Sequence, residues 1–317
     1  MTEALIFDTH RATSHDGEGL RTTFFFQGCP LRCKWCHNPE GIFREPYIKW
    51  DAKKCIGCRK CTGSCPERAL WFTDDGIRID RACCTRCEIC SEGCPAKALK
   101  ISAKSWSVDM LVKYAQKDRH FYDAFHGGVT LSGGEATLYS LFIAGAAEKL
   151  QSVGINVALD TSGYCEADVF ESLFSTINYI LFDLKFADES RHREFTGAGN
   201  SRILDNFNRI VQAKKVGTYS GELWIRTPVI PNATDSESNI LAIADILYTH
   251  SDMIDRWELC AFNNMCKDKY RNLGIAWEYM ESGLLPDSRM RALLQTAKKV
   301  IGSRFPVLSS GLTAKEQ

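Results

Sequence analysis

The chain has 317 residues, 44% of them apolar, so it can bury a substantial core as one large domain or two ordinary ones. Its 39 basic and 39 acidic side chains balance, which argues against a nucleic-acid or membrane partner held by overall charge. No run of about 18 apolar residues occurs, and the first residues resemble a strand rather than a signal peptide. We therefore expect a cytoplasmic protein.

Strand-like and helix-like segments alternate along most of the chain. In chain order, strands are predicted over 22–27, 128–132, 155–159, 179–184, 223–230 and 257–262. Helices are predicted from Val108 with Ser107 as N-cap, around 138–145, from Ala167, and over 201–215, 238–248 and 288–301. About six strand-then-helix units imply an α/β fold with a parallel sheet, an incomplete (β/α)6 barrel. We assign residues 1–46 and 103–317 to this barrel.

Fifteen cysteines are the exceptional feature of the composition, and twelve of them precede residue 95. Most fall in tight Cys-x-x-Cys runs, which point their thiolates at a common centre, as metal or cluster ligands must. A disulfide framework is the alternative, and it fits a long chain without a secretory signal poorly. The pattern indicates a reducing, oxygen-poor setting.

The first group is Cys29-Pro-Leu-Arg-Cys33-Lys-Trp-Cys36, directly after a predicted strand. Active-site loops of α/β barrels lie at the carboxyl ends of the strands. Three cysteines bind only three irons of a four-iron cubane and leave one iron for a ligand, whereas structural clusters use four cysteines. A zinc site that borrows a fourth ligand such as His37 is the alternative.

Two further runs follow in register: Cys55, Cys58, Cys61 and Cys65 before Pro66, and Cys84, Cys87, Cys90 and Cys94 before Pro95. Both match the bacterial ferredoxin run, whose fourth cysteine ligates the other cluster. One cluster is therefore assigned to Cys55, Cys58, Cys61 and Cys94, and the other to Cys84, Cys87, Cys90 and Cys65. Residues 47–102 form a ferredoxin-like insert. Cys83 is one residue out of register and is left spare, and Cys165, Cys260 and Cys266 are interpreted as small buried hydrophobes.

Several segments together resemble glycyl-radical-enzyme activating enzymes of the radical S-adenosylmethionine superfamily. Besides the three-cysteine motif, they are HDGEGLRT (15–22), LSGGE (131–135), DTSG (160–163), FDLK (182–185) and WIRTPVIP (224–231). The resemblance spans essentially the whole chain. Its paired ferredoxin runs are similar to the branch that activates lyases, dehydratases and decarboxylases.

The resemblance implies a set of cofactor contacts that share a place at or just after strand ends. They are Trp35, Cys36, His37, Gly133, Gly134, Glu135, Asp160, Asp183, Leu184, Lys185 and Asn263. The first three are expected along the adenine, and the glycine turn with its glutamate at the methionyl amino group. The aspartates are expected at the methionyl end or at a monovalent cation, and the lysine at the carboxylate or ribose. Core packing for the tryptophan, a simple turn for the glycines and surface charge for the aspartates and lysine are the alternatives.

Asn263 stands where the family commonly has a nucleoside-contacting histidine, and its amide can still donate and accept. Asp16, in the glycine-rich loop, is expected to contact the partner's radical loop, with a turn residue as the alternative.

The implied activity is reductive cleavage of S-adenosylmethionine, followed by hydrogen abstraction from a glycine Cα of a partner enzyme. Three 4Fe-4S clusters are implied, with electrons from a flavodoxin or ferredoxin. One alternative is a radical enzyme acting on a small molecule or peptide. Another is a non-catalytic electron-transfer protein, for which the three-cysteine motif and the GGE segment would have no role.

Overall fold

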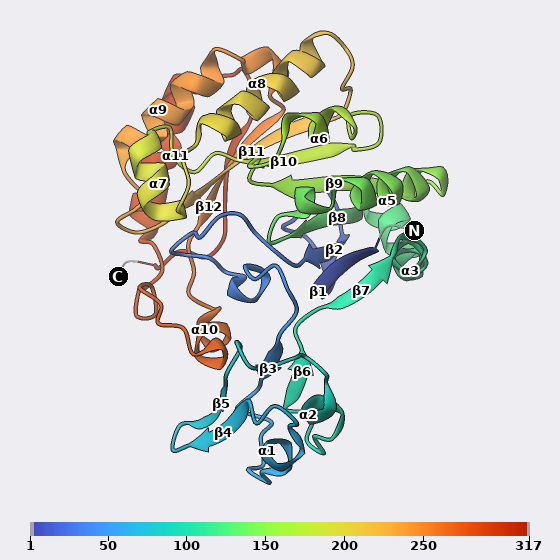
Figure 1. Ribbon diagram of the computed structural model, residues 1–317. Coiled ribbons are helices and arrows are strands. Elements are labelled where there is room, and N and C mark those ends of the chain that lie inside the picture. The colour runs from blue at the N-terminus through green and yellow to red at the C-terminus, as the bar shows by residue number, and fades with distance from the viewer. Residues whose placement is uncertain (1–2, 316–317) are drawn as a thin grey trace.

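The computed structural model describes residues 3–315, and a nine-stranded sheet forms its body (Figure 1). The strand order is β13-β12-β11-β10-β9-β8-β2-β1-β7. Pairing is parallel from β2 to β13, whereas β1 runs antiparallel to both β2 and β7. The strands are β1 Glu3–Thr13, β2 Arg21–Phe26, β7 Lys104–Ser107, β8 Gly128–Gly133, β9 Asn156–Thr161, β10 Tyr179–Asp183, β11 Glu222–Val229, β12 Arg256–Ala261 and β13 Val307–Ser310.

Helices connect the parallel strands, and most of them bury one face of the sheet. They are α3 Val108–Ala115, α4 Arg119–Phe125, α5 Ser140–Ser152, α6 Ala167–Glu171, α7 Glu189–Thr196, α8 Ser201–Lys215, α9 Glu237–Tyr248, α10 Lys267–Leu273 and α11 Asp287–Ile301. Short 3-10 turns are η1 Pro39–Gly41, η2 Gln116–Asp118, η3 Ala136–Tyr139 and η4 Ser251–Met253. Val157 and Leu159 of β9 lie in the large core, so Asp160 points to the opposite face of the sheet.

Residues 48–101 form a separate small body beside the sheet (Figure 1). Its elements are β3 Ile48–Trp50, α1 Lys60–Ser64, β4 Leu70–Thr73, β5 Gly76–Ile79, α2 Ile89–Glu92 and β6 Leu99–Ile101. β3 pairs antiparallel with β6, β4 pairs with β5, and they share a core of their own. Ser102 N donates to Tyr47 O at 2.7 Å, which holds the two ends of this body side by side.

The predicted strands and helices all occur, with ends shifted by a few residues. Ser107 caps α3 by accepting a hydrogen bond from Met110 N at 3.3 Å, and α8 spans the predicted 201–215. The helix predicted around 138–145 is α5, in which Leu141 is 75% exposed and Phe142, Ile143, Ala146 and Leu150 are buried. The elements β7, α4, α7, α10 and β13 were not predicted. They are short, and α7 carries mostly polar residues.

Candidate active site and cluster-binding insert

The first cysteine group lies on the loop after β2, and its three thiols converge. Burial raises the pKa of Cys29 to about 12, and the neighbouring Cys33 thiol adds to that shift. Burial likewise raises the pKa of Cys36, with further contributions from Cys33 and Cys29. Thiolates in so buried a place require positive charge nearby, as a bound metal provides. The residues therefore fit a cationic iron–sulfur centre.

The three-cysteine loop, Cys29–Cys36, is anchored along its backbone. Arg32 N and Lys34 N donate to carbonyls in the last turn of α7, at 2.7 and 2.9 Å. The Tyr270 hydroxyl donates to Cys36 O and the Trp277 indole to Lys34 O, both at 2.9 Å. The Tyr270 and Trp277 rings stack at 4.6 Å. Segments distant in sequence thus hold the loop.

A buried lysine at the carboxyl end of β10 faces this loop. The Lys185 side chain is 8% exposed, and its Nζ lies 2.7 Å from Asp183 Oδ2. Burial lowers the pKa of Lys185, but Asp183 and the Cys33 and Cys29 thiolates outweigh that effect and raise it. The structure therefore brings Asp183 and Lys185 to the cysteine loop as a fixed positive charge with its counterion.

A row of polar side chains continues across the strand ends on the face away from the helices. Ser132 Oγ donates to Asp160 Oδ2 at 2.7 Å, and Arg226 Nη1 lies 3.3 Å from Asp160 Oδ1. Arg226 Nε lies 3.6 Å from Glu258 Oε2. Burial raises the pKa of Asp160 to about 6, Arg226 opposes the shift and Asp183 adds to it. The titratable carboxyl of Asp160 therefore lies beside the Asp183–Lys185 ion pair.

The glycine turn after β8 packs closely against the cysteine loop. Gly134 N donates to Phe26 O at 2.9 Å. The Glu135 side chain is buried, with Oε1 accepting from Thr161 Oγ1 at 2.7 Å and Oε2 from Ser162 N at 2.9 Å. Glu135 therefore ties the turn to the end of β9. Its expected contact with a methionyl amino group stays a prediction.

Two residues predicted to lie along the adenine, Trp35 and His37, differ in their surroundings. Trp35 is buried, with ring centroids 6.2 Å from both Phe186 and Phe195, so its indole packs in an aromatic cluster. His37 Nε2 is buried and has no hydrogen-bond partner among residues 3–315. Burial lowers the pKa of His37, and a hydrogen bond to the Asn263 backbone opposes this. The neutral ring beside Asn263 therefore has a free nitrogen for a ligand.

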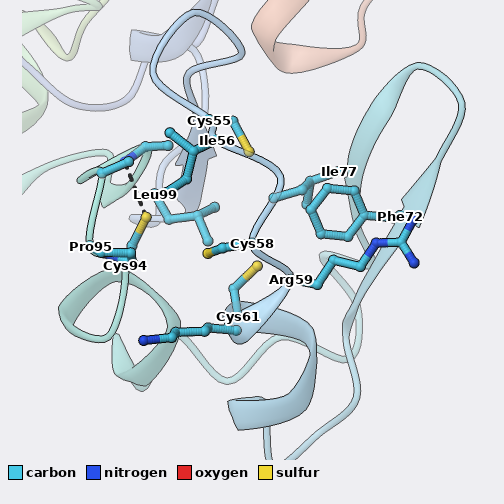
Figure 2. Close-up of a pocket in the computed structure, with 13 residues that line it drawn as sticks. Cys55, Ile56, Cys58, Arg59, Cys61, Phe72, Ile77, Cys94, Pro95 and Leu99 are labelled. Atoms are coloured by element: carbon cyan, nitrogen blue, oxygen red, sulfur yellow. Dashed lines mark hydrogen bonds between the residues drawn. The ribbon is translucent and has the colours of Figure 1, made fainter.

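The ferredoxin-type cysteines line two pockets in the small body. The first pocket is lined by Cys55, Cys58 and Cys61 of the first run together with Cys94 of the second (Figure 2). The second pocket is lined by Cys84, Cys87 and Cys90 together with Cys65. Within residues 3–315, no three or more His, Cys, Asp or Glu side chains are arranged around a single ion. A cubane takes one ligand at each iron, so its thiolates surround a volume instead of a point.

The four remaining cysteines differ among themselves. Cys83 is exposed, and Cys165 and Cys266 are buried, as small apolar residues commonly are. The same interpretation of Cys260 was wrong. Its side chain is half-buried, and it interacts with Arg226 and Glu258, because alternation along β12 turns it to the polar face.

Comparisons with known proteins place these features in a family. The family described as the Radical SAM superfamily matches residues 77–243, and a 4Fe-4S binding domain and a 4Fe-4S single cluster domain match 47–70 and 15–56. A 4-hydroxyphenylacetate decarboxylase activating enzyme of Clostridioides difficile (strain 630) is 35% identical, over 92% of each chain. A trans-4-hydroxy-L-proline dehydratase activating enzyme of Clostridioides difficile is 37% identical, over 86% of this chain and 89% of that one. The chain belongs to the glycyl-radical-enzyme activating enzymes of the radical S-adenosylmethionine superfamily.

A solved structure shares the fold of this activating enzyme. Streptococcus suis SuiB, bound to precursor peptide SuiA, superposes with a TM-score of 0.51 at 14% identity, over 89% of this chain and 46% of that one. Among residues 3–315, no helix is long and apolar enough to cross a membrane.

The motifs alone did not assign a role to three side chains of the activating enzyme's polar row. Ser132, Arg226 and Glu258 lie within predicted strands. Arg226 interrupts the apolar run of β11, and a charged residue amid a buried strand is the signal that would have found it. Pairing of β11 with β10 and β12 then sets Arg226 opposite Asp183 and Glu258.

The loop that carries Asp16 folds onto the sheet of the activating enzyme. Asp16 Oδ2 accepts from Thr23 Oγ1 at 2.7 Å, and Asp16 O accepts from Thr130 Oγ1 at 2.6 Å. Arg21 is fully buried and its Nε donates to Thr130 Oγ1 at 2.7 Å. Asp16 thus shares the polar face with Asp160, and its contact with a partner stays a prediction.

Replacing Gly134 with alanine is expected to destabilise the activating enzyme. An added Cβ would lie 2.1 Å from Gly28 O and 2.6 Å from Gly41 O, both backbone atoms of the cysteine-loop region. Overpacking against backbone costs about 1–3 kcal/mol. Gly145→Ala in α5 is the matched control, because its Cβ would meet only Val108 Cγ2 at 3.8 Å. Anaerobic denaturant titration should show a lower midpoint for Gly134→Ala alone, and equal midpoints for the two variants would contradict the close packing.

Proposed function

We propose that this chain activates a glycyl radical enzyme of the decarboxylase and dehydratase branch. Cys29, Cys33 and Cys36 would hold a 4Fe-4S cluster, which would supply the electron that cleaves bound S-adenosylmethionine to methionine and a 5′-deoxyadenosyl radical. That radical would take a hydrogen atom from a partner glycine Cα. The protein's own residues bind and orient these groups and exclude water.

One observation carries the proposal: the cysteine loop, the Asp183–Lys185 pair and the Asp160–Arg226 pair meet at the carboxyl edge of the parallel sheet. Such an edge is where α/β enzymes bind their ligands. Lys185 provides a buried cation for a carboxylate. Asp160 and Asp183 provide carboxylates for a cationic group or a monovalent cation.

The remaining proposed contacts lie around this edge. His37 offers its free nitrogen to the nucleoside with Asn263 beside it, and the Gly133–Glu135 turn and Leu184 are the further proposed contacts. A zinc ion at the cysteine loop is the weaker alternative, because within residues 3–315 no three His, Cys, Asp or Glu side chains are placed to hold a single metal ion.

We further propose an incomplete (β/α)6 barrel, residues 1–46 and 103–317, interrupted by a ferredoxin-like insert at 47–102. The insert's own core and the hydrogen bond between Ser102 and Tyr47 support this division. The grouping of Cys55, Cys58, Cys61 and Cys94, and of Cys84, Cys87, Cys90 and Cys65, supports two 4Fe-4S clusters. A flavodoxin or ferredoxin would supply their electrons. Reduced, unpaired cysteines favour a cytoplasmic, oxygen-poor setting.

Iron content tests the cluster assignment. Three cubanes imply about twelve iron atoms per chain after anaerobic reconstitution. Cys58→Ala and Cys87→Ala should each lower that content, since each removes one ligand from one pocket, whereas Cys83→Ala should not. Saturation near four iron atoms (about one cubane) with no loss in either ligand variant would rule out clusters in the insert.

A further inference from the structure

The two pockets of the insert carry opposite charges at their rims. Arg59 and Lys60 line the first pocket, and no carboxylate of residues 3–315 lines it. Glu67 and Glu88 line the second pocket, where the described part of the chain places no lysine or arginine. Two sites built from the same cysteine run therefore present different electrostatic surfaces.

The two pockets differ in charge because of their side chains, whereas their backbones are alike. Arg59 and Glu88 each follow the second cysteine of their run. Each is the N-cap of the short helix that follows, α1 or α2, with φ of 58° and 60°. The two positions are structural equivalents, so one carries a cation where the other carries an anion.

The first pocket faces solvent at the end of the insert. Its α1 helix lies far from the nine-stranded sheet (Figure 1). Ile56 is 69% exposed beside the exposed Cys58. The Arg59 guanidinium lies 5.3 Å from the centroid of the Phe72 ring, which holds it over this face (Figure 2). An apolar centre with two cations at its rim is thus open to a partner.

We propose that an acidic one-electron carrier protein docks on this face, defined by Ile56, Arg59 and Lys60, and delivers its electron to the cluster of the first pocket. The inference rests on the clusters of the proposed function. The carrier is oxidised by one electron, the cluster is reduced by one, and no atom is transferred. Opposite charges steer such encounters, and the Glu67 and Glu88 rim repels the same carrier from the second pocket.

Cross-linking of the unaltered protein maps the docking face. Reconstituted enzyme is mixed with an acidic ferredoxin, and a carbodiimide joins carboxylates of the ferredoxin to nearby lysines, which mass spectrometry then locates. We expect Lys60 among the linked residues, with the links lost at high salt. Links confined to lysines of the sheet body, or protection of Lys60 by the glycyl radical enzyme in place of the ferredoxin, would overturn the proposal.

The kinetics of cluster reduction provide a second test of the docking face. Arg59→Glu with Lys60→Glu should slow reduction of the insert clusters by reduced ferredoxin by about tenfold or more at low ionic strength. The matched control, Glu67→Lys with Glu88→Lys, should not slow it. The difference should vanish near 1 M salt, where the Debye length is about 3 Å. If reversal of the acidic rim slows the reaction equally, the assignment of the face fails.

Reduction by dithionite distinguishes a docking defect from the loss of a cluster. This small reductant needs no docking face, so it should bleach the insert clusters of parent and both charge variants to the same extent. If Arg59→Glu with Lys60→Glu loses iron, the reduction kinetics are measured with Arg59→Gln and Lys60→Gln instead. This neutral variant should also slow reduction by ferredoxin, but by a smaller factor. Failure of dithionite to reduce any insert cluster in the parent would contradict the proposed electron-carrying clusters of the insert, independently of where the carrier docks.

Discussion

Cys33→Ala is expected to abolish cleavage of S-adenosylmethionine. The substitution removes the central thiol of a group whose members interact with one another and with Lys185. Two cysteines cannot hold the three irons that leave the fourth open. The loop should keep its position, because Arg32 and Lys34 still donate to α7. The measurement is chromatographic quantification of 5′-deoxyadenosine after anaerobic reduction.

Iron content and a cysteine control make this experiment specific. Cys33→Ala should lose about four of about twelve iron atoms and retain the insert clusters. Cys83→Ala removes an exposed cysteine outside the three groups and should leave 5′-deoxyadenosine formation unchanged. Production at the parent level by Cys33→Ala would contradict the assignment of the loop as the reactive centre.

Mixing the protein anaerobically with its partner, S-adenosylmethionine and a reductant is expected to install a glycyl radical on the partner. The cysteine loop, Lys185 and Asp160 converge at one edge of the sheet, which is where we propose that the adenosyl group binds. The target Cα must come within near-attack distance, about 3–3.5 Å between reacting atoms. The loop of the partner that carries the target glycine must therefore enter this site. Electron paramagnetic resonance should show a doublet from α-hydrogen coupling.

The partner's own glycine is the control for this signal. Substitution of that glycine by alanine should remove the doublet while 5′-deoxyadenosine still forms. The candidate partners are glycyl radical enzymes encoded nearby. If none of them gives the doublet although S-adenosylmethionine is cleaved, activation is the wrong function, and a radical enzyme for a small molecule or peptide replaces it.

Most elements of the sheet body could be predicted from sequence because their patterns are local. The parallel strands are continuous apolar runs, and α8 has a clear helical period over Ser201–Lys215. The helix α7 could not be predicted in this way, because it is short and mostly polar. Its importance lies in tertiary hydrogen bonds, since its last turn accepts from Arg32 and Lys34.

The cysteine spacing alone predicts which thiols belong together, since Cys-x-x-Cys neighbours cannot reach separate centres and the ferredoxin run implies exchange of its fourth cysteine. The contacts of Arg226 lie beyond any such pattern. They depend on pairing between strands, which sets Arg226 opposite Asp183 and Glu258, within reach of Asp160. Likewise, the sequence gives the charges of Arg59 and Glu88, but the exposure of these two side chains depends on how residues 48–101 pack. Local spacing acts through the covalent backbone, whereas electrostatics and burial depend on groups far apart in sequence.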